Sequence, residues 1–109
     1  KLINTDNAES IVSVCKPESS HPDFIISLEN GFIKKYYGKG FSHKRRQDLD
    51  DVFYYEGTFY TSKVSTLKSK KSFYHKNTLG YEVPRWKSFE VDEEIDLKII
   101  ESILKFKKI

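Results

Sequence analysis

The hydrophobic pattern of this chain begins with short runs of the kind found in β-strands. Apolar, β-branched and aromatic residues cluster in stretches of four to six, separated by polar segments. Ser10–Cys15 predicts a buried strand, and alternating apolar positions between residues 24 and 28 predict a second. Asn30-Gly31 follows at once, and this dipeptide tolerates positive φ angles. A β-hairpin is therefore predicted around residues 24–37.

The middle of the chain alternates between polar loop and aromatic strand. Residues 38–51 carry glycines and charges and predict an exposed loop. Residues 52–64 are rich in aromatic and β-branched side chains, and Glu56-Gly57 within them predicts a turn or a bulge. A short helix with Val64 and Leu67 facing inward is predicted next, followed by a short strand at Tyr81–Val83.

The C-terminal segment changes to a helical repeat. Apolar residues recur at helical spacing, and acids precede them while lysines follow, as the helix dipole favours. Asp92 is predicted to be the N-cap. The repeat is formed by Ile95, Ile99, Ile100, Ile103 and Leu104.

Two acids just before this helix need a separate explanation. The segment Ser88–Val91 predicts a strand, on which Glu90 and Asp92 would project from one face. Carboxylates at the C-terminal end of a strand lie where α/β enzymes tend to bind ligands. The pair is either a metal site or a solvated strand residue followed by a helix cap. Strands followed by one helix predict an α/β or α+β fold.

Composition narrows the possible classes. A chain of 109 residues forms at most one domain, and a net charge of +3 is too small to imply nucleic-acid binding. The chain has no run of 18 apolar residues, so no membrane-spanning helix is predicted. The single cysteine, Cys15, cannot form an internal disulfide, so we expect a buried thiol in a cytoplasmic protein.

Four stretches, in order, resemble the C-terminal half of the acylneuraminate (CMP-sialic acid) cytidylyltransferases. They are "ESIVSVCKPESSHP", "RRQDL", "EGTFY" and "SFEVDEEIDLKIIESIL". The sequence departs from the family at three of their positions. Asp50 replaces a proline, Glu56 replaces an asparagine, and Glu90 replaces the first aspartate of the metal pair.

The resemblance implies a fold and a division of the chain. We expect an α/β protein, the C-terminal part of a Rossmann-like nucleotide-diphospho-sugar transferase sheet, with an inserted β-hairpin dimerisation subdomain and a C-terminal helix. Residues 1–109 would form a partial cytidylyltransferase domain. Residues 16–55 would be the dimerisation and sugar-facing insertion, and residues 56–109 would return to the core sheet and the final helix.

The resemblance also implies an activity. The family joins a nonulosonic acid to CTP, giving the CMP-sugar and pyrophosphate. The glycine-, lysine- and arginine-rich loop that holds CTP in the N-terminal half has no counterpart here, so the fragment alone is expected to be inactive. CTP, the sugar and a second copy in a homodimer are the implied partners, with no nucleic acid and no membrane.

Site residues follow from the same resemblance. Glu90 and Asp92 would hold Mg²⁺ or another divalent cation and act as the catalytic pair. Arg46 would grip the sugar carboxylate and Gln47 would hydrogen-bond the sugar. Tyr60, Phe73 and Tyr74 would line the sugar pocket. The alternatives are a solvated basic loop for Arg46, core packing for the aromatic residues, and a non-catalytic sugar-binding or dimerisation module for the whole chain.

Overall fold

The structure is a computed structural model that describes residues 7–17, 20–38 and 44–109. The chain divides into two compact units. The smaller unit is Lys16–Tyr54, and the larger unit is Lys1–Cys15 together with Tyr55–Ile109. The larger unit holds β1 (Ser10–Cys15), nearly all of β4 (Tyr54–Ser62), α1 (Val64–Lys70), β5 (Thr78–Glu82), the 3₁₀ turn η4 (Arg85–Lys87) and α2 (Glu94–Lys107). The smaller unit holds η2 (Pro22–Phe24), β2 (Ile26–Glu29), β3 (Phe32–Lys35) and η3 (Arg46–Asp48).

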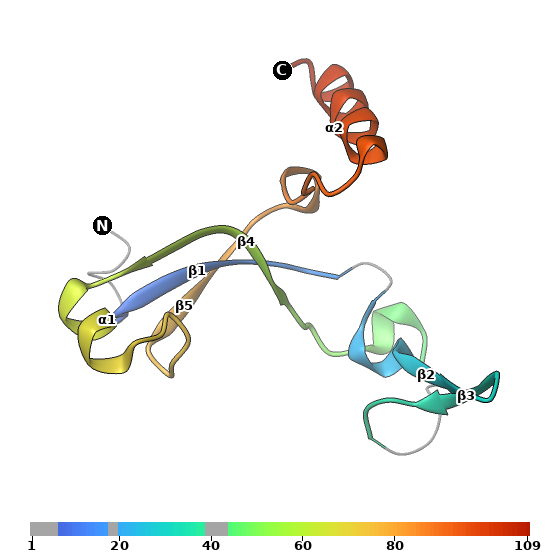
Figure 1. The fold of residues 1–109 in the computed structure, drawn as a ribbon, viewed down its shortest axis with the longest axis horizontal. Coiled ribbons are helices and arrows are strands. Elements are labelled where there is room, and N and C mark those ends of the chain that lie inside the picture. Colours follow the sequence, from blue (N-terminus) through green and yellow to red (C-terminus); the bar gives the residue numbers. More distant parts are fainter. Residues whose placement is uncertain (1–6, 18–19, 39–43) are drawn as a thin grey trace. The chain divides into compact units, whose positions relative to one another are not determined.

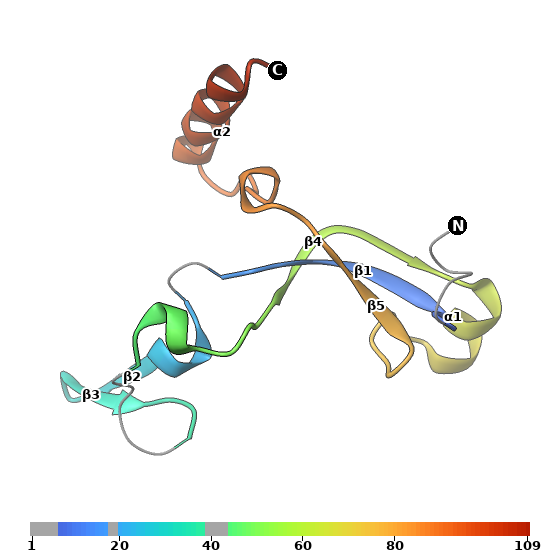
Figure 2. The same ribbon diagram turned by 180° about the vertical axis from the view of Figure 1, so that it is seen from behind.

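The larger unit is built on a three-stranded mixed sheet in the order β4-β1-β5 (Figures 1 and 2). β1 and β5 run parallel, with a register that runs from Ser10 opposite Thr78 to Val14 opposite Glu82. The pairing extends one residue further, because the backbone N–H of Val83 donates to the Val14 carbonyl at 2.8 Å. The chain therefore has a mixed α/β architecture, while the Rossmann-like assignment stays a prediction.

The buried core follows the central strand. β1 has a neighbouring strand on each edge, and consecutive residues along it are buried, so the side chains on both of its faces are covered. The buried strand predicted at Ser10–Cys15 is confirmed. The buried apolar residues are Ala8, Ile11, Val12, Cys15 and Val83. This core is small for 109 residues, since several strand and helix positions elsewhere keep apolar side chains exposed.

The smaller unit contains the predicted hairpin. β2 and β3 pair antiparallel, with Ile26 opposite Lys35 and Glu29 opposite Phe32. Asn30 and Gly31 connect them with φ angles of 51° and 85°, as a type I′ turn requires. Leu28, Phe32 and Ile33 all remain exposed. The hairpin prediction is confirmed.

Both predicted helices form, but the inward residues of the first and the cap of the second differ from the prediction. α1 forms, but Val64 and Leu67 are exposed and Thr66 is its buried residue. The inward orientation predicted for Val64 and Leu67 is therefore wrong. With a helical repeat of 3.6 residues, a helix that turns Thr66 inward must direct these two neighbours elsewhere.

α2 begins after Glu93, not after Asp92, so the predicted cap is corrected by one residue. The carboxylate of Asp96 accepts hydrogen bonds from the backbone N–H groups of Glu93 (2.8 Å) and Asp92 (2.9 Å). These bonds, first that of Glu93, lower the pKa of Asp96. Asp92 therefore contributes its backbone N–H to the cap, and not its carboxylate.

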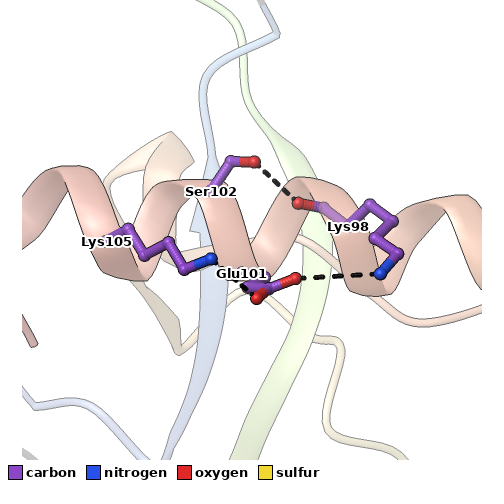
Figure 3. A network of polar contacts seen from close by, with 4 residues as sticks. All are labelled: Lys98, Glu101, Ser102 and Lys105. Atoms are coloured by element: carbon purple, nitrogen blue, oxygen red, sulfur yellow. Dashed lines mark hydrogen bonds and ion pairs between the residues drawn. The ribbon is translucent and has the colours of Figure 1, made fainter.

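The exposed face of α2 carries a short polar network (Figure 3). Glu101 pairs with Lys105 at 2.8 Å and with Lys98 at 4.0 Å, and the Ser102 hydroxyl donates to the Lys98 carbonyl at 2.9 Å. Such exposed pairs at helical spacing add only a few tenths of a kcal/mol each, about 0.3–0.5. They mark this face of the helix as solvated.

The strand predicted at Ser88–Val91 is wrong. β5 is the last strand of the described residues, at Thr78–Glu82, and it covers most of the strand predicted at Tyr81–Val83. Pro84 then ends the pairing, since it has no N–H to donate, and the chain turns through η4. Glu90 and Asp92 therefore lie in a connecting segment, and the argument that a strand places both on one face no longer holds.

Candidate functional site at the bulge of strand β4

The middle of β4 is bent at Gly57. Its φ of +83° lies in the left-handed region that favours glycine. Because β4 is unbroken from Tyr54 to Ser62, the structure fits a bulge rather than the alternative prediction of a turn at Glu56-Gly57. Glu56, just before it, is only 4% exposed. Its Oε1 accepts from the Thr58 backbone N–H at 3.0 Å and its Oε2 from the Thr58 hydroxyl at 2.7 Å. The carboxylate thus spans the bend from one side of Gly57 to the other.

Neutral donors keep this buried carboxylate ionised. Burial raises the pKa of Glu56, but hydrogen bonds from the Ser13 hydroxyl and from the Thr58 hydroxyl and amide outweigh it, so the pKa is lowered. Ser13 also accepts from the Phe59 amide at 3.1 Å, which ties the bend to the central strand β1. Glu56 is therefore a structural anion rather than an exposed ligand.

The bend changes which side chains share a face. In a regular strand Tyr55 and Tyr60, five residues apart, would project from opposite faces. Here both contact Tyr74, with ring centroids 4.3 Å apart for Tyr55 and 6.2 Å for Tyr60. One extra residue at Gly57 reverses the alternation and brings the two rings together.

Phe73 completes the group of rings, with its centroid 5.4 Å from that of Tyr60. We call Tyr55, Tyr60, Phe73 and Tyr74 the aromatic cluster. The Tyr60–Tyr74 hydrogen bond raises the pKa of Tyr74, with smaller contributions from burial and from the neighbouring phenols. The three tyrosines of the aromatic cluster are each more than 40% exposed, so ring surface is open to a ligand.

A carboxylate lies beside the cluster. A Cβ on Gly57 would lie 3.3 Å from Glu90 Oε1 and 3.8 Å from the Tyr60 hydroxyl. The bare Cα of Gly57 thus provides the space that the Glu90 carboxylate and the Tyr60 hydroxyl share. Acid, phenol and aromatic surface meet at one point of the sheet.

The structure brings together four of the predicted site residues: Glu90, Tyr60, Phe73 and Tyr74. Asp92 is exposed and lies two residues beyond Glu90, before the cap of α2. Gln47 is exposed in η3, within the other unit. The Arg46 side chain lies outside the described residues.

Sequence reasoning missed Tyr55 and the role of Glu56. Tyr55 was not among the aromatic residues assigned to the site. Glu56 was noted only as a replacement of an asparagine, whereas its carboxylate is buried beside the site. The glycine inside the strand was the available signal, because a bulge reverses the alternation beyond it.

A serine and a histidine also meet in the larger unit. Ser10 Oγ lies 2.9 Å from His75 Nε2, and Asn77 N–H donates to His75 Nδ1 at 3.2 Å. Because Nδ1 accepts, Nε2 carries the ring hydrogen and donates a hydrogen bond to Ser10 Oγ, and the Ser10 hydroxyl donates in turn to Ser62 Oγ at 2.8 Å. A nucleophile would need the opposite direction, and Ser10 is 0% exposed, so this pair is structural.

Two cavities lie outside the aromatic cluster. One of about 230 Å³ lies between η4 and α2 and is mainly apolar; another of about 110 Å³ belongs to the smaller unit. The first is lined by Trp86, Lys87, Phe89, Ile100, Ile103 and Leu104. Neither contains a residue that the sequence predicted for the site.

Two features are absent from the described residues, a metal cage and a membrane-spanning helix. Among residues 7–17, 20–38 and 44–109, no three histidine, cysteine or acidic side chains gather as a metal cage would require. Within the same ranges, no helix has the length and apolar character needed to cross a membrane.

Comparison with known proteins supports the resemblance stated from the sequence. The chain is 29% identical over 96 residues to N-acylneuraminate cytidylyltransferase of Streptococcus agalactiae serotype V, and a serotype III protein of the same name matches equally. It is 28% identical over 83 residues to a Helicobacter pylori protein named pseudaminic acid cytidylyltransferase and UDP-2,4-diacetamido-2,4,6-trideoxy-beta-L-altropyranose hydrolase. No model of a protein family matches the chain.

These matches cover most of this chain but little of the relatives. The alignments include 85% and 76% of the chain, yet they span 22% of the streptococcal protein and 16% of the Helicobacter protein. The chain is thus distantly similar to nonulosonic acid cytidylyltransferases over part of their length. The resemblance expected from the four sequence stretches is confirmed at that level.

Proposed function

We propose that this chain is part of a cytidylyltransferase that activates a sialic-acid-like nonulosonic acid. In this reaction the sugar's anomeric hydroxyl attacks the α-phosphorus of CTP, the bond to the β-phosphate breaks, and pyrophosphate leaves with the CMP-sugar formed. Two lines of support meet here: the distant similarity to such enzymes, and the gathering of Glu90 and the aromatic cluster at Gly57. The second observation carries the proposal, because residues far apart in sequence converge there.

The aromatic cluster suits the apolar parts of the sugar. Acyl groups and ring C–H bonds pack well on aromatic faces, while phenol hydroxyls satisfy sugar hydroxyls. We assign Tyr60, Phe73 and Tyr74 to this role. Tyr55 adds a further exposed ring, 4.3 Å from that of Tyr74.

The acidic residues fit a magnesium ion that is bound mainly by its substrate. Mg²⁺ is commonly held by one or two carboxylates together with phosphate oxygens, so a three-residue cage is not required. Glu90 has its carboxylate in the space left by the missing Cβ of Gly57, and Asp92 is exposed nearby in sequence. We propose that these two would hold Mg²⁺, which when bound would neutralise phosphate charge.

The remaining roles rest on the similarity alone. Arg46 is proposed to pair with the sugar carboxylate, and Gln47 to hydrogen-bond the sugar. CTP, a second copy of the chain in a homodimer, and a cytoplasmic location complete the proposal. The activity itself is assigned to the whole enzyme.

Saturation-transfer NMR with N-acetylneuraminic acid tests the sugar site on the 109-residue chain. We expect the acyl methyl to receive the strongest transfer, because it would pack on the rings. Tyr60→Ala and Tyr74→Ala should each remove most of the signal. Tyr36→Ala, in the smaller unit, is the matched control and should leave the signal unchanged. Transfer that survives both cluster substitutions would overturn the proposed site.

A second candidate is a non-catalytic sugar-binding or dimerisation module of the same fold. The exposed apolar side chains of the β2–β3 hairpin, Leu28, Phe32 and Ile33, favour an association role. Both candidates include a dimer, so sedimentation equilibrium of the wild type and of Phe32→Ser tests whether the hairpin forms it. Calorimetric titration of the chain with CTP separates the candidates, because strong binding of CTP would contradict the module.

A further inference from the structure

We infer that Glu56 is the positioning residue that assembles the site, because it holds the bend of β4 on which the aromatic cluster and Glu90 depend. The inference rests on the proposed function for the identity of the ligand. The arrangement itself is judged by an independent measurement below.

The bend of β4 needs a residue that holds it. A glycine at φ +83° has many accessible conformations, so it does not fix its own geometry. The Glu56 carboxylate does, because its two oxygens accept from the amide and hydroxyl of Thr58, on the far side of Gly57. It closes a small ring around the bend, as a side-chain cap closes a turn.

The bend is also anchored to the centre of the sheet. The Ser13 hydroxyl on β1 bonds Glu56, and Ser13 in turn accepts from the Phe59 amide. Because Glu56 is 4% exposed, water cannot readily replace these bonds if the carboxylate is removed. Removing it would leave the amide and hydroxyl donors of Thr58 without their acceptor, whereas the Ser13 hydroxyl can still donate to the Phe59 carbonyl at 3.3 Å.

The site follows from the bend in two ways. First, the extra residue turns Tyr55 and Tyr60 to the same face, where both contact Tyr74. Second, the exposed Cα of Gly57 leaves room for Glu90 Oε1 and the Tyr60 hydroxyl. A straightened strand would restore the alternation, separating Tyr55 from Tyr60, and would change the space beside Glu90.

Glu56 therefore acts without touching the ligand. The family that the sequence resembles has asparagine at this position. The asparagine side chain is one methylene shorter than that of glutamate and carries no charge. The glutamate reaches across Gly57 to both donors of Thr58. The position thus tunes how the aromatic cluster is presented to the sugar.

The test uses NMR of the full 109-residue chain with labelled tyrosine rings. The reporter is the nuclear Overhauser cross-peak between the rings of Tyr55 and Tyr74, whose centroids lie 4.3 Å apart. The fold control is the set of cross-peaks between β1 and β5, for example between Ser10 and Thr78. A residue with a merely structural role would affect both sets together.

We expect Glu56→Ala to lose the ring cross-peak while the β1–β5 cross-peaks remain. Glu56→Gln keeps the length of the side chain and an acceptor for Thr58, so it should retain the ring cross-peak. Loss in both variants, with the sheet intact, also supports the inference and assigns the effect to the charge. A Tyr55–Tyr74 cross-peak that persists in Glu56→Ala overturns it.

A second variant covers failure to fold. If Glu56→Ala loses the β1–β5 cross-peaks as well, Thr58→Val removes the hydroxyl donor and leaves the carboxylate in place. Weakening of the ring cross-peak in Thr58→Val supports the inference, and an unchanged cross-peak overturns it. Saturation transfer from N-acetylneuraminic acid is recorded in parallel. Its absence from the wild type would contradict the proposed function, while the ring cross-peaks would still decide the role of Glu56.

Discussion

Glu90 and Gly57, 33 positions apart in the sequence, meet so closely that a single carbon atom would disturb them. A Cβ on Gly57 would lie 3.3 Å from Glu90 Oε1, closer than side-chain carbons ordinarily approach another atom. The same glycine has φ +83°, which other L residues adopt at a cost. The backbone therefore favours glycine here, and a side chain at this position would also make the Glu90 carboxylate shift by a few tenths of an ångström.

Gly57→Ala should consequently destabilise the chain by about 1–2 kcal/mol from the backbone alone, with a further cost from displacing Glu90. Gly31→Ala is the matched control, because Gly31 also has a positive φ (+85°) and an added Cβ there would meet nothing within 4 Å. It should lose only the backbone part. Urea unfolding measures both, and a loss in Gly57→Ala no larger than that in Gly31→Ala would show that the Glu90 carboxylate adds no cost.

Cation binding should depend on the acids beside the aromatic cluster. Tb³⁺ emission, excited through nearby tyrosines, can report binding and its displacement by Mg²⁺. Glu90→Gln and Asp92→Asn should each weaken binding by about tenfold or more, because each removes a proposed ligand. Glu82→Gln, an exposed acid on β5, should leave it unchanged. If all three variants bind Tb³⁺ alike, the proposed cation site is wrong.

The start of α2 should weaken in acid. The pKa of Asp96 is lowered from 3.8, first by the Glu93 amide and then by that of Asp92, so its contribution is present above pH 3.8 and is lost as the pH falls below it. Far-UV circular dichroism of the wild type should lose helical signal in that range. Asp96→Asn should begin with less helix and show a smaller acid change, while Glu94→Gln should follow the wild type.

Ser10 and His75 should be coupled in stability and not in reactivity. A double-mutant cycle with Ser10→Ala and His75→Ala should give a coupling free energy of about 0.5–3 kcal/mol, as expected of residues in one hydrogen-bond network. A serine-directed fluorophosphonate should not label the protein. Labelling that His75→Ala abolishes would reverse our interpretation and indicate a nucleophile.

Lys71 ends α1 in the left-handed conformation, with φ 53°. Lys71→Gly should stabilise the chain by about 0.5–1 kcal/mol, because relief of the left-handed strain exceeds the extra entropy of an unfolded glycine. Lys70→Gly, one residue earlier and inside the helix, should instead destabilise it by about 1 kcal/mol. Thermal unfolding compares the two. A loss of stability in Lys71→Gly would contradict the explanation.

The sequence predicted those elements whose signals are local. Ser10–Cys15, the turn at Asn30-Gly31 and the repeat of α2 each carry their information within a few residues, and each is confirmed. The strand predicted at Ser88–Val91 failed because alternation alone cannot show whether a pairing partner exists. Sheet pairing ends before Pro84, and the chain turns through η4 before it reaches Ser88.

The candidate site shows the same limit. Glu90, Tyr60, Phe73 and Tyr74 were chosen by resemblance. Glu90 and Tyr60 meet beside Gly57, and Phe73 and Tyr74 contact Tyr60. The contact of Tyr55 with Tyr74 and the hydrogen bond of Glu56 to Ser13, 43 positions earlier, join residues distant in the sequence. Such long-range contacts leave no periodic trace in the chain.

The parallel pairing of β1 with β5 has a consequence for how the chain comes together in time. Ser10 faces Thr78, so this pairing joins strands 68 residues apart, and a loop of that length is entropically slow to close. The hairpin at Asn30-Gly31 joins residues only a few positions apart and can close on the microsecond scale. On a ribosome β1 and its other neighbour, β4, would emerge before β5 exists, and one edge of β1 would remain unpaired throughout that delay.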